Sequence, residues 1–266
     1  MRLHSSTLSV SSSFAAVTVA ATAAVFLTCF TSPANAQEFF GKDLNGSNTA
    51  LPAGSRTNSN AARASFLSNL TGVGTESFEG FSADQPTPLA LVFPGAGQAT
   101  LTGEGGNGNI RNTPGTGTYA TDGSQYFIGN GRFTVAFAQD IAAFGFTATD
   151  VGDISGDMTL TFRNNGGVVF TKIVPRVGVP TNPVTDPTNP NNGSALFFGY
   201  INTTSLFDEV IFGNTEVSQF DGFGFDQMTI GARQQVTAVP EPSEWLAMGM
   251  AAASVGGLMV RARRRQ

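Results

Sequence analysis

The chain has 266 residues, and its 19 Asp and Glu outnumber its 14 Lys and Arg, for a formal net charge of −5. Residues 37–239 hold 9 Lys and Arg against 17 Asp and Glu, so no basic face for nucleic acid is expected. The single histidine, His4, and the single cysteine, Cys29, lie in the first 36 residues. Without that segment the chain has no side chains for Ser-His-Asp or Cys-His catalysis, for a Cys/His zinc site or for a disulfide.

The first 36 residues have the features of a secretory signal peptide. Arg2 gives a basic start, residues 14–30 carry no charge, and Ala34-Asn35-Ala36 places small residues at the spacing that signal peptidase accepts. We therefore expect a helical signal segment, passage through the Sec translocon, and cleavage by signal peptidase between Ala36 and Gln37. An uncleaved anchor helix is the alternative.

Residues 37–74 are predicted to be a loop-rich segment with one short helix. Residues 39–60 are rich in Gly, Asn, Ser and Thr and show little periodicity, which is typical of loops. A helix is expected over residues 60–70, because Ala62, Phe66 and Leu70 fall on one face.

Residues 75–231 have the pattern of an all-β domain. Residues 133–138 and 158–163 alternate between apolar and smaller or polar side chains, and Asn165-Gly166 predicts a tight hairpin turn after the second run. The other expected strands are residues 77–81, 89–93, 99–102, 125–128, 141–149, 168–173, 195–201, 209–212 and 223–230. Many short strands between Gly-rich turns indicate an antiparallel sandwich or barrel, whose core would take most of the 23 Phe.

A linker over residues 232–238 leads to a C-terminal segment with three parts. Val239-Pro240-Glu241-Pro242 comes first, and residues 245–260 then form an uncharged run. A basic cluster follows, made of Arg261, Arg263, Arg264 and Arg265. The run is short for a membrane span, and the arginines favour a cytoplasmic end.

In this order of parts, residues 239–266 resemble the PEP-CTERM sorting domain. The resemblance implies recognition by an exosortase, a membrane cysteine protease proposed to cut near the motif. It also implies one transmembrane helix in the inner membrane, and later a place at the cell surface or in the extracellular matrix of a Gram-negative-type bacterium. The same tail is sometimes labelled an ice-binding protein C-terminal domain, but the sequence has no regular Thr-x-Thr array.

Three segments of the all-β domain are similar to domains often found upstream of PEP-CTERM tails. They are residues 75–81, 144–153 and 221–230. The similarity implies a jelly-roll-like antiparallel β-sandwich and an exported location. It implies no activity.

Four acidic residues are candidate ligands for a structural Ca²⁺. Glu79 lies on the first expected strand and Asp226 on the last, while Asp150 and Asp153 share one loop. Carboxylate oxygens suit a hard cation, so either pair could contribute to a site. Solvated aspartates at turns are the alternative. The apolar alternation changes phase after Asp226, which predicts a β-bulge there.

Tyr119 and Tyr126 are the candidate glycan contacts. They flank residues 121–124, a predicted turn, so they are the tyrosines expected to be exposed to a sugar. Core tyrosines with satisfied hydroxyl groups are the alternative.

Three classes of function remain open. We expect first a non-catalytic structural or adhesive protein of the cell surface or exopolysaccharide matrix. A carbohydrate-binding module is the first alternative, with exopolysaccharide as the partner. A glycoside hydrolase with a carboxylate pair is the less favoured alternative, because no pair of acidic residues stands out.

Overall fold

The computed structural model describes residues 36–45, 47–151, 156–175, 193–215 and 222–237. Most of the expected signal peptide, the sorting motif Val239–Pro242 and the basic cluster lie outside these residues, so they stay predictions. No helix within the described ranges is long and apolar enough to cross a membrane.

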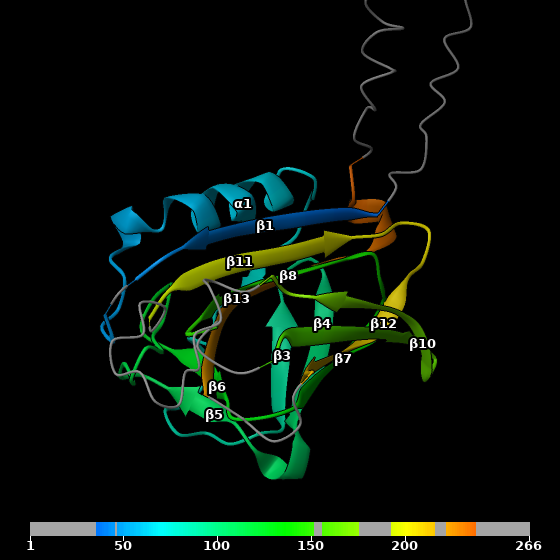
Figure 1. Ribbon diagram of the computed structural model, residues 1–266. Helices are drawn as coiled ribbons and strands as arrows, with labels where there is room; N and C mark the ends of the chain where they lie inside the picture. The colour runs from blue at the N-terminus through cyan, green and yellow to red at the C-terminus, as the bar shows by residue number, and fades with distance from the viewer. Residues whose placement is uncertain (1–35, 46, 152–155, 176–192, 216–221, 238–266) are drawn as a thin grey trace, which may run out of the picture. The chain divides into compact units, whose positions relative to one another are not determined.

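Two antiparallel sheets pack as a β-sandwich, as the sequence predicted (Figure 1). The first sheet has seven strands in the order β1-β11-β8-β13-β6-β5, with β2 paired to β13. Its strands are β1 (Gln37–Asp43), β2 (Thr75–Glu76), β5 (Asn109–Arg111), β6 (Tyr126–Gly129), β8 (Ala143–Thr149), β11 (Ala195–Ile201) and β13 (Phe223–Gly231). The jelly-roll connectivity stays a prediction.

The second sheet has six strands in the order β10-β9-β12-β7-β4-β3. Its strands are β3 (Leu89–Phe93), β4 (Gly97–Gly103), β7 (Phe133–Ile141), β9 (Met158–Asn164), β10 (Gly167–Ile173) and β12 (Phe207–Asn214). The helical elements are α1 (Thr57–Leu67) and three short 3₁₀ turns, η1 (Ala53–Ser55), η2 (Glu104–Gly106) and η3 (Arg233–Gln235).

Phenylalanine fills much of the space between the sheets. Most strands of the second sheet bury alternate residues, as in β3, where Leu91 is buried while Ala90 and Val92 are exposed, but the edge strand β10 has no buried residue. Phe133 and Phe212 stack with their ring centroids 4.1 Å apart, and Phe225 of the first sheet meets Phe133 edge-on at 4.9 Å. The expectation that phenylalanine would fill the core is therefore confirmed.

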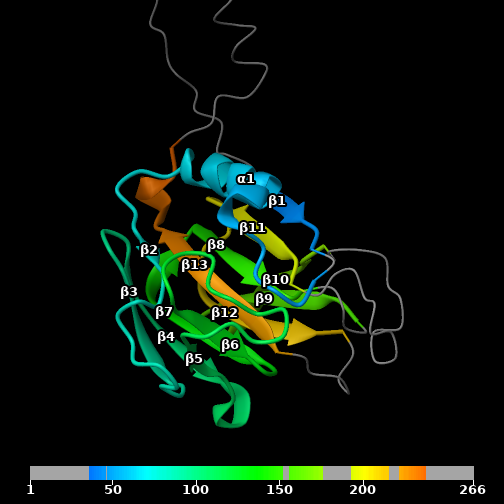
Figure 2. The ribbon, with the colours of Figure 1, turned by 90° about the vertical axis from the view of Figure 1, so that its left-hand side faces the viewer.

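The central strands β8 and β11 are buried on both faces. One face meets the second sheet, and α1 covers the other side over β1, β11 and part of β8 (Figures 1 and 2). This double burial explains why residues 143–149 and 195–201 show no apolar-polar alternation.

Two glycines allow α1 to lie close to the first sheet. Gly199 of β11 pairs with Gly145 of β8, and the fully buried Phe66 of α1 lies over both. A Cβ atom on Gly199 would lie 2.7 Å from the Phe66 ring, and one on Gly145 would lie 2.9 Å from it. We call this contact the glycine saddle.

The loop predicted for residues 39–60 is partly wrong. Residues 37–43 form β1, which pairs with β11 from Gln37 opposite Ile201 to Asp43 opposite Ala195. The sequence of β1 has no strict alternation. The strand is at the edge of the sheet, where it pairs with β11 and is covered by α1. The sandwich therefore includes part of the segment expected to be loop-rich, and the predicted short helix begins at Thr57.

Two expected strands differ from the observed ones. Residues 77–81 form a turn, in which Phe78 has a φ of 63° and the Phe81 N–H donates to the Phe78 carbonyl. Residues 141–149 divide at Ala142, where the chain passes from β7 in the second sheet to β8 in the first. The predicted hairpin is confirmed: Asn165 and Gly166 have φ values of 48° and 77° between β9 and β10.

Both ends of the described domain lie on the same side of the sandwich (Figure 1). Phe39 near the start of β1 and Val236 after η3 pack against one small cluster, which contains Phe66, Phe197 and Ile201. The chain therefore enters and leaves the domain close to α1.

Candidate binding site

The β-bulge predicted after Asp226 is confirmed. The pairing of β13 with β8 shifts register between Asp226 and Thr229, and Gln227 has a φ of 51°. The bulge lets Phe225, Met228 and Ile230 all be buried, although they are out of phase. It also directs the Asp226 side chain to the loop at residues 121–125.

Asp226 and Glu79 hold the same loop from two sides. The Asp226 Oδ2 atom accepts from the N–H groups of Thr121 and Asp122 at 2.7 and 2.8 Å. The Glu79 Oε1 atom accepts from the N–H groups of Ser124 and Gln125 at 2.7 and 2.6 Å. The structure therefore brings both predicted acids to one loop, where these oxygens bind backbone donors.

The two carboxyl groups differ in electrostatic environment. Asp226 is almost fully buried, and this burial raises its pKa to about 7 against the opposing effect of its hydrogen bonds. Burial is also the largest effect on Glu79, but hydrogen bonds from Gln125 and Ser124 outweigh it and hold the pKa of Glu79 below its ordinary value. Of these two carboxyl groups, Asp226 is therefore the one whose pKa burial raises to about 7.

Arginines of the helical segment complete the support of this loop. The buried Arg56 donates from Nη1 to the Thr121 carbonyl oxygen at 2.6 Å. Burial lowers the pKa of Arg63, while the charges of Asp122 and Asp226 raise it. Neither role could be predicted from the sequence, because both arginines are distant from the loop along the chain.

The other predicted calcium ligands are not brought to Glu79 and Asp226. Asp150 is buried with a φ of 67°, and its carboxylate accepts from the Gly193 N–H at 3.4 Å. Asp153 lies outside the described residues. Within the ranges that the structure describes, no three acidic, histidine or cysteine side chains cluster as a metal site would require. Calcium binding stays a prediction.

The expected exposure of Tyr119 and Tyr126 is wrong. Their relative exposures are 2% and 1%, and both hydroxyl groups are hydrogen-bonded to other loops. The Tyr119 hydroxyl donates to the Gly193 carbonyl oxygen at 2.9 Å, and burial raises its pKa to about 12. The alternative of core tyrosines with satisfied hydroxyl groups describes both residues.

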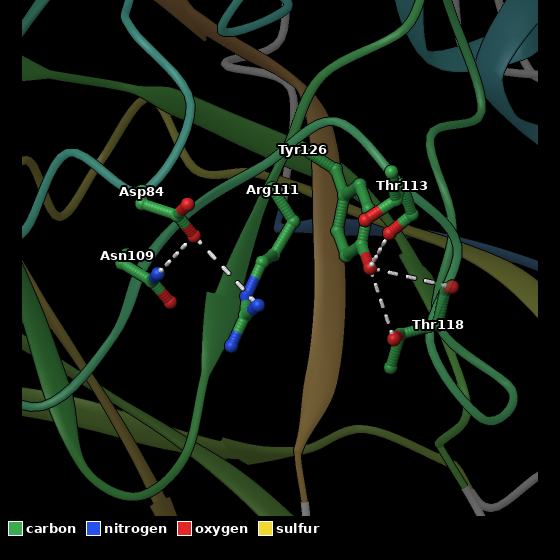
Figure 3. A network of polar contacts seen from close by, with 6 residues as sticks. All are labelled: Asp84, Asn109, Arg111, Thr113, Thr118 and Tyr126. Atoms are coloured by element: carbon green, nitrogen blue, oxygen red, sulfur yellow. Dashed lines mark hydrogen bonds and ion pairs between the residues drawn. The ribbon is translucent and has the colours of Figure 1, made fainter.

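Tyr126 nevertheless contributes to a surface cavity of about 320 Å³ between β5, β6 and the loop at residues 112–118. The residues that give the cavity its chemistry are Arg111, Thr113, Thr116, Thr118, Tyr126 and Ile128. Figure 3 shows the Tyr126 hydroxyl held by Thr113 and Thr118, and Arg111 beside Asp84. We call it the Arg111 cavity.

Two other surface cavities differ in their chemistry. One, of about 260 Å³, contains Arg132 together with its ion-pair partner Glu104. The other, of about 380 Å³, lies on the outer face of β3, β4 and β7 and has no charged residue in its lining. Of these three, the Arg111 cavity alone combines a cation with several hydroxyl groups and no lining carboxylate. Sequence reasoning missed Arg111, because a single Arg at the end of a three-residue strand has no distinguishing pattern.

The chain matches no family model and no curated protein. Among solved structures it is similar to the K2 cleaved adhesin domain of Lys-gingipain, with 14% identity and a TM-score of 0.36 over 59% of this chain and 97% of that one. It is also similar to TmCBM61 in complex with β-1,4-galactotriose, with 11% identity and a TM-score of 0.26 over 50% of this chain and 88% of that one.

Proposed function

We propose that this chain is an exported protein of the cell surface or extracellular matrix, whose β-sandwich has a structural and adhesive role without catalysis. The observation that carries the proposal is that three of its carboxylates accept hydrogen bonds from backbone N–H groups of the domain itself. Asp43 accepts from the N–H groups of Asn58 and Ser59 at the start of α1, while Glu79 and Asp226 hold the loop at residues 121–125. These hydrogen bonds of the three acids are made to backbone groups of the scaffold itself.

A hydrolase would use its acids differently. Glycoside hydrolysis needs two carboxyl groups about 5–9 Å apart on either side of a sugar. Of the three cavities described above, two have no acidic lining residue and the third has Glu104 alone. None of these three cavities therefore has the pair of carboxyl groups that this mechanism needs.

The proposed localisation is inferred from the sequences of the two ends of the chain. The signal peptide would direct export, and the PEP-CTERM tail would hold the chain in the inner membrane until an exosortase acts. Both ends of the domain lie on one side of the sandwich, which suits such attachment, because the opposite side would then point away from the membrane.

The localisation can be tested by replacing Pro240, Glu241 and Pro242 with alanine in the producing bacterium. We expect the wild-type chain to lose its tail and reach the surface or matrix fraction. The triple variant should remain full-length in the inner membrane, whereas Glu244→Ala, just outside the motif, should behave as wild type. A wild-type chain that stays in the cytoplasm would overturn the proposed localisation.

The adhesive role needs a separate test with the purified full-length chain and a strain that lacks it. Loss of the chain should weaken matrix cohesion or surface attachment, and incubation with the producer's exopolysaccharide should release no new reducing ends. Unchanged cohesion would contradict the adhesive role. A steady rise in reducing ends would instead establish a hydrolase.

A further inference from the structure

We propose that the Arg111 cavity binds one hexuronate residue of an acidic polysaccharide. The inference rests on the proposed adhesive function and adds a ligand class and a position to it. It depends on the chemistry of one cavity, whose walls come from β5, β6 and the loop at residues 112–118.

The cavity is held in shape by hydrogen bonds within its loop. The Gly115 N–H donates to the Thr118 carbonyl oxygen at 2.8 Å, and the Gly117 N–H donates to the Asn48 carbonyl oxygen at 3.1 Å. The Tyr126 hydroxyl joins the loop at two points, donating to the Thr113 carbonyl oxygen at 3.1 Å and contacting Thr118 Oγ1 at 3.1 Å. A cavity formed in advance loses little conformational entropy when a ligand binds.

The lining matches a ligand with one negative charge and several hydroxyl groups. Arg111 supplies a planar set of donors that fits a carboxylate. The threonines at positions 113 and 116 carry hydroxyl groups that can donate to or accept from sugar hydroxyls. Ile128 offers an apolar contact for the C–H face of a sugar ring. A volume of about 320 Å³ suits a single sugar residue and part of its neighbours.

Arg111 can exchange its present partner for a ligand. Its Nη1 atom lies 3.7 Å from Asp84 Oδ1, and the two side chains are 45% and 75% exposed. Such exposed ion pairs contribute little stability, so a bound carboxylate can compete with Asp84. Asp84 is not part of the cavity lining.

The cavities of Arg111 and Arg132 differ in whether an acid lines them, and this difference favours anion binding at Arg111. Arg132 also lies in an exposed ion pair, 3.8 Å from Glu104. Glu104 is part of the lining of that second cavity, whereas Asp84 lies outside the lining of the Arg111 cavity, so a ligand carboxylate would meet the partner acid inside the cavity only at Arg132. Arg132 is therefore a matched control, with the same side chain, a similar exposure and a different neighbourhood.

The test uses the purified full-length chain and a short oligogalacturonate in isothermal titration calorimetry. The methyl-esterified oligomer keeps the ring and removes the carboxylate charge, so it is the matched ligand. We expect the acid to bind at least tenfold more tightly than the ester, and the affinity for the acid to fall as salt is raised. Arg111→Gln should lose this preference, whereas Arg132→Gln should keep it.

Thr116→Val provides a second variant that leaves Arg111 and its charge in place. It should weaken binding of both ligands severalfold, and circular dichroism and thermal unfolding should show the wild-type fold. Equal binding of acid and ester, unchanged binding by Arg111→Gln, or no heat with either ligand would overturn the hexuronate site. None of these results contradicts the adhesive role, which depends on matrix cohesion in the strain that lacks the chain.

Discussion

At the scale of single residues, Asp226 links a feature that is visible in the sequence, the phase change after it, to the position of a surface loop. The phase change after it requires a bulge, and the bulge turns its carboxylate toward the loop at residues 121–125. Its oxygens accept from the N–H groups of Thr121, Asp122 and Gln227 and from the Thr121 hydroxyl. One buried acid thus fixes the loop that precedes Tyr126.

This placement predicts that stability depends on pH in a defined window. The pKa of Asp226 is about 7 in the folded state and has an ordinary value of 3.8, so the folded chain holds this proton more tightly than the unfolded chain. The free energy of unfolding should therefore fall as pH rises from about 4 to about 7. Urea denaturation across this range measures the slope, and Asp226→Asn should flatten it.

The exposed Asp140→Asn is the control, and it should keep the wild-type slope. Asp43 and Glu79 act in the opposite sense in another window. Their lowered pKa values stabilise the fold above about pH 4, and this contribution is lost as pH falls through their folded-state values. An unchanged slope in Asp226→Asn would show that another group titrates between pH 4 and 7.

At the scale of elements, the glycine saddle decides where α1 lies. The helix has little amphipathic character, and its buried residues are Ser59 and Phe66. Gly145 and Gly199 remove the side chains that would hold Phe66 away from β8 and β11. The helix position therefore depends on one aromatic ring and on two residues without a Cβ atom.

Gly199→Ala should destabilise the fold by roughly 1–3 kcal/mol, because its Cβ atom would overlap the Phe66 ring. Gly54→Ala is the matched control, since a Cβ atom there meets nothing within 4 Å and should change stability by less than about 0.5 kcal/mol. Chemical denaturation measures both. Adding Phe66→Leu to Gly199→Ala should recover part of the loss, and a neutral Gly199→Ala would show that α1 shifts freely.

At the scale of the whole domain, non-covalent contacts close the sides of the sandwich. At one side Lys172 of β10 lies 3.4 Å from Glu38 of β1 and 4.5 Å from the centre of the Tyr200 ring, so the two sheets are joined there. At the edge strand β5, the segment before β3 covers the backbone: the Asp84 N–H donates to the Ile110 carbonyl, and the Ile110 N–H to the Gln85 carbonyl. Cys29 is the chain's only cysteine, so no disulfide within the chain adds to these contacts and to the core.

The predicted calcium site can be tested on the whole domain by thermal unfolding with Ca²⁺ and with EGTA. A ligand present at about 100 times its Kd stabilises the folded state by about 2.7 kcal/mol, which would raise Tm by several degrees. A higher Tm with Ca²⁺ would support a site that includes Glu79, Asp150, Asp153 or Asp226. Mg²⁺ at the same concentration is the control for general salt effects, and equal Tm values in Ca²⁺ and EGTA would reject the site.

The sequence by itself determined the class of the fold and several local features. Residues 133–138 and 158–163 could be assigned as strands because each buries one face, which produces a period of two. Asn165-Gly166 identified its hairpin because few other residue pairs adopt two positive φ values. The bulge at Asp226 was also visible, because a phase change leaves a trace in the order of apolar residues.

Only the tertiary structure decided the features that depend on distant partners. β1 is a strand because β11 pairs with it, and Tyr119 and Tyr126 are buried because loops cover them. Asp226 and Glu79 meet on one loop although 147 positions separate them in the chain. The Arg111 cavity is formed by β5, β6 and a loop. No local pattern in the sequence shows that Glu104 lines the cavity of Arg132 while Asp84 lies outside the lining of the Arg111 cavity. Such features depend on three-dimensional proximity, which periodicity along the chain does not encode.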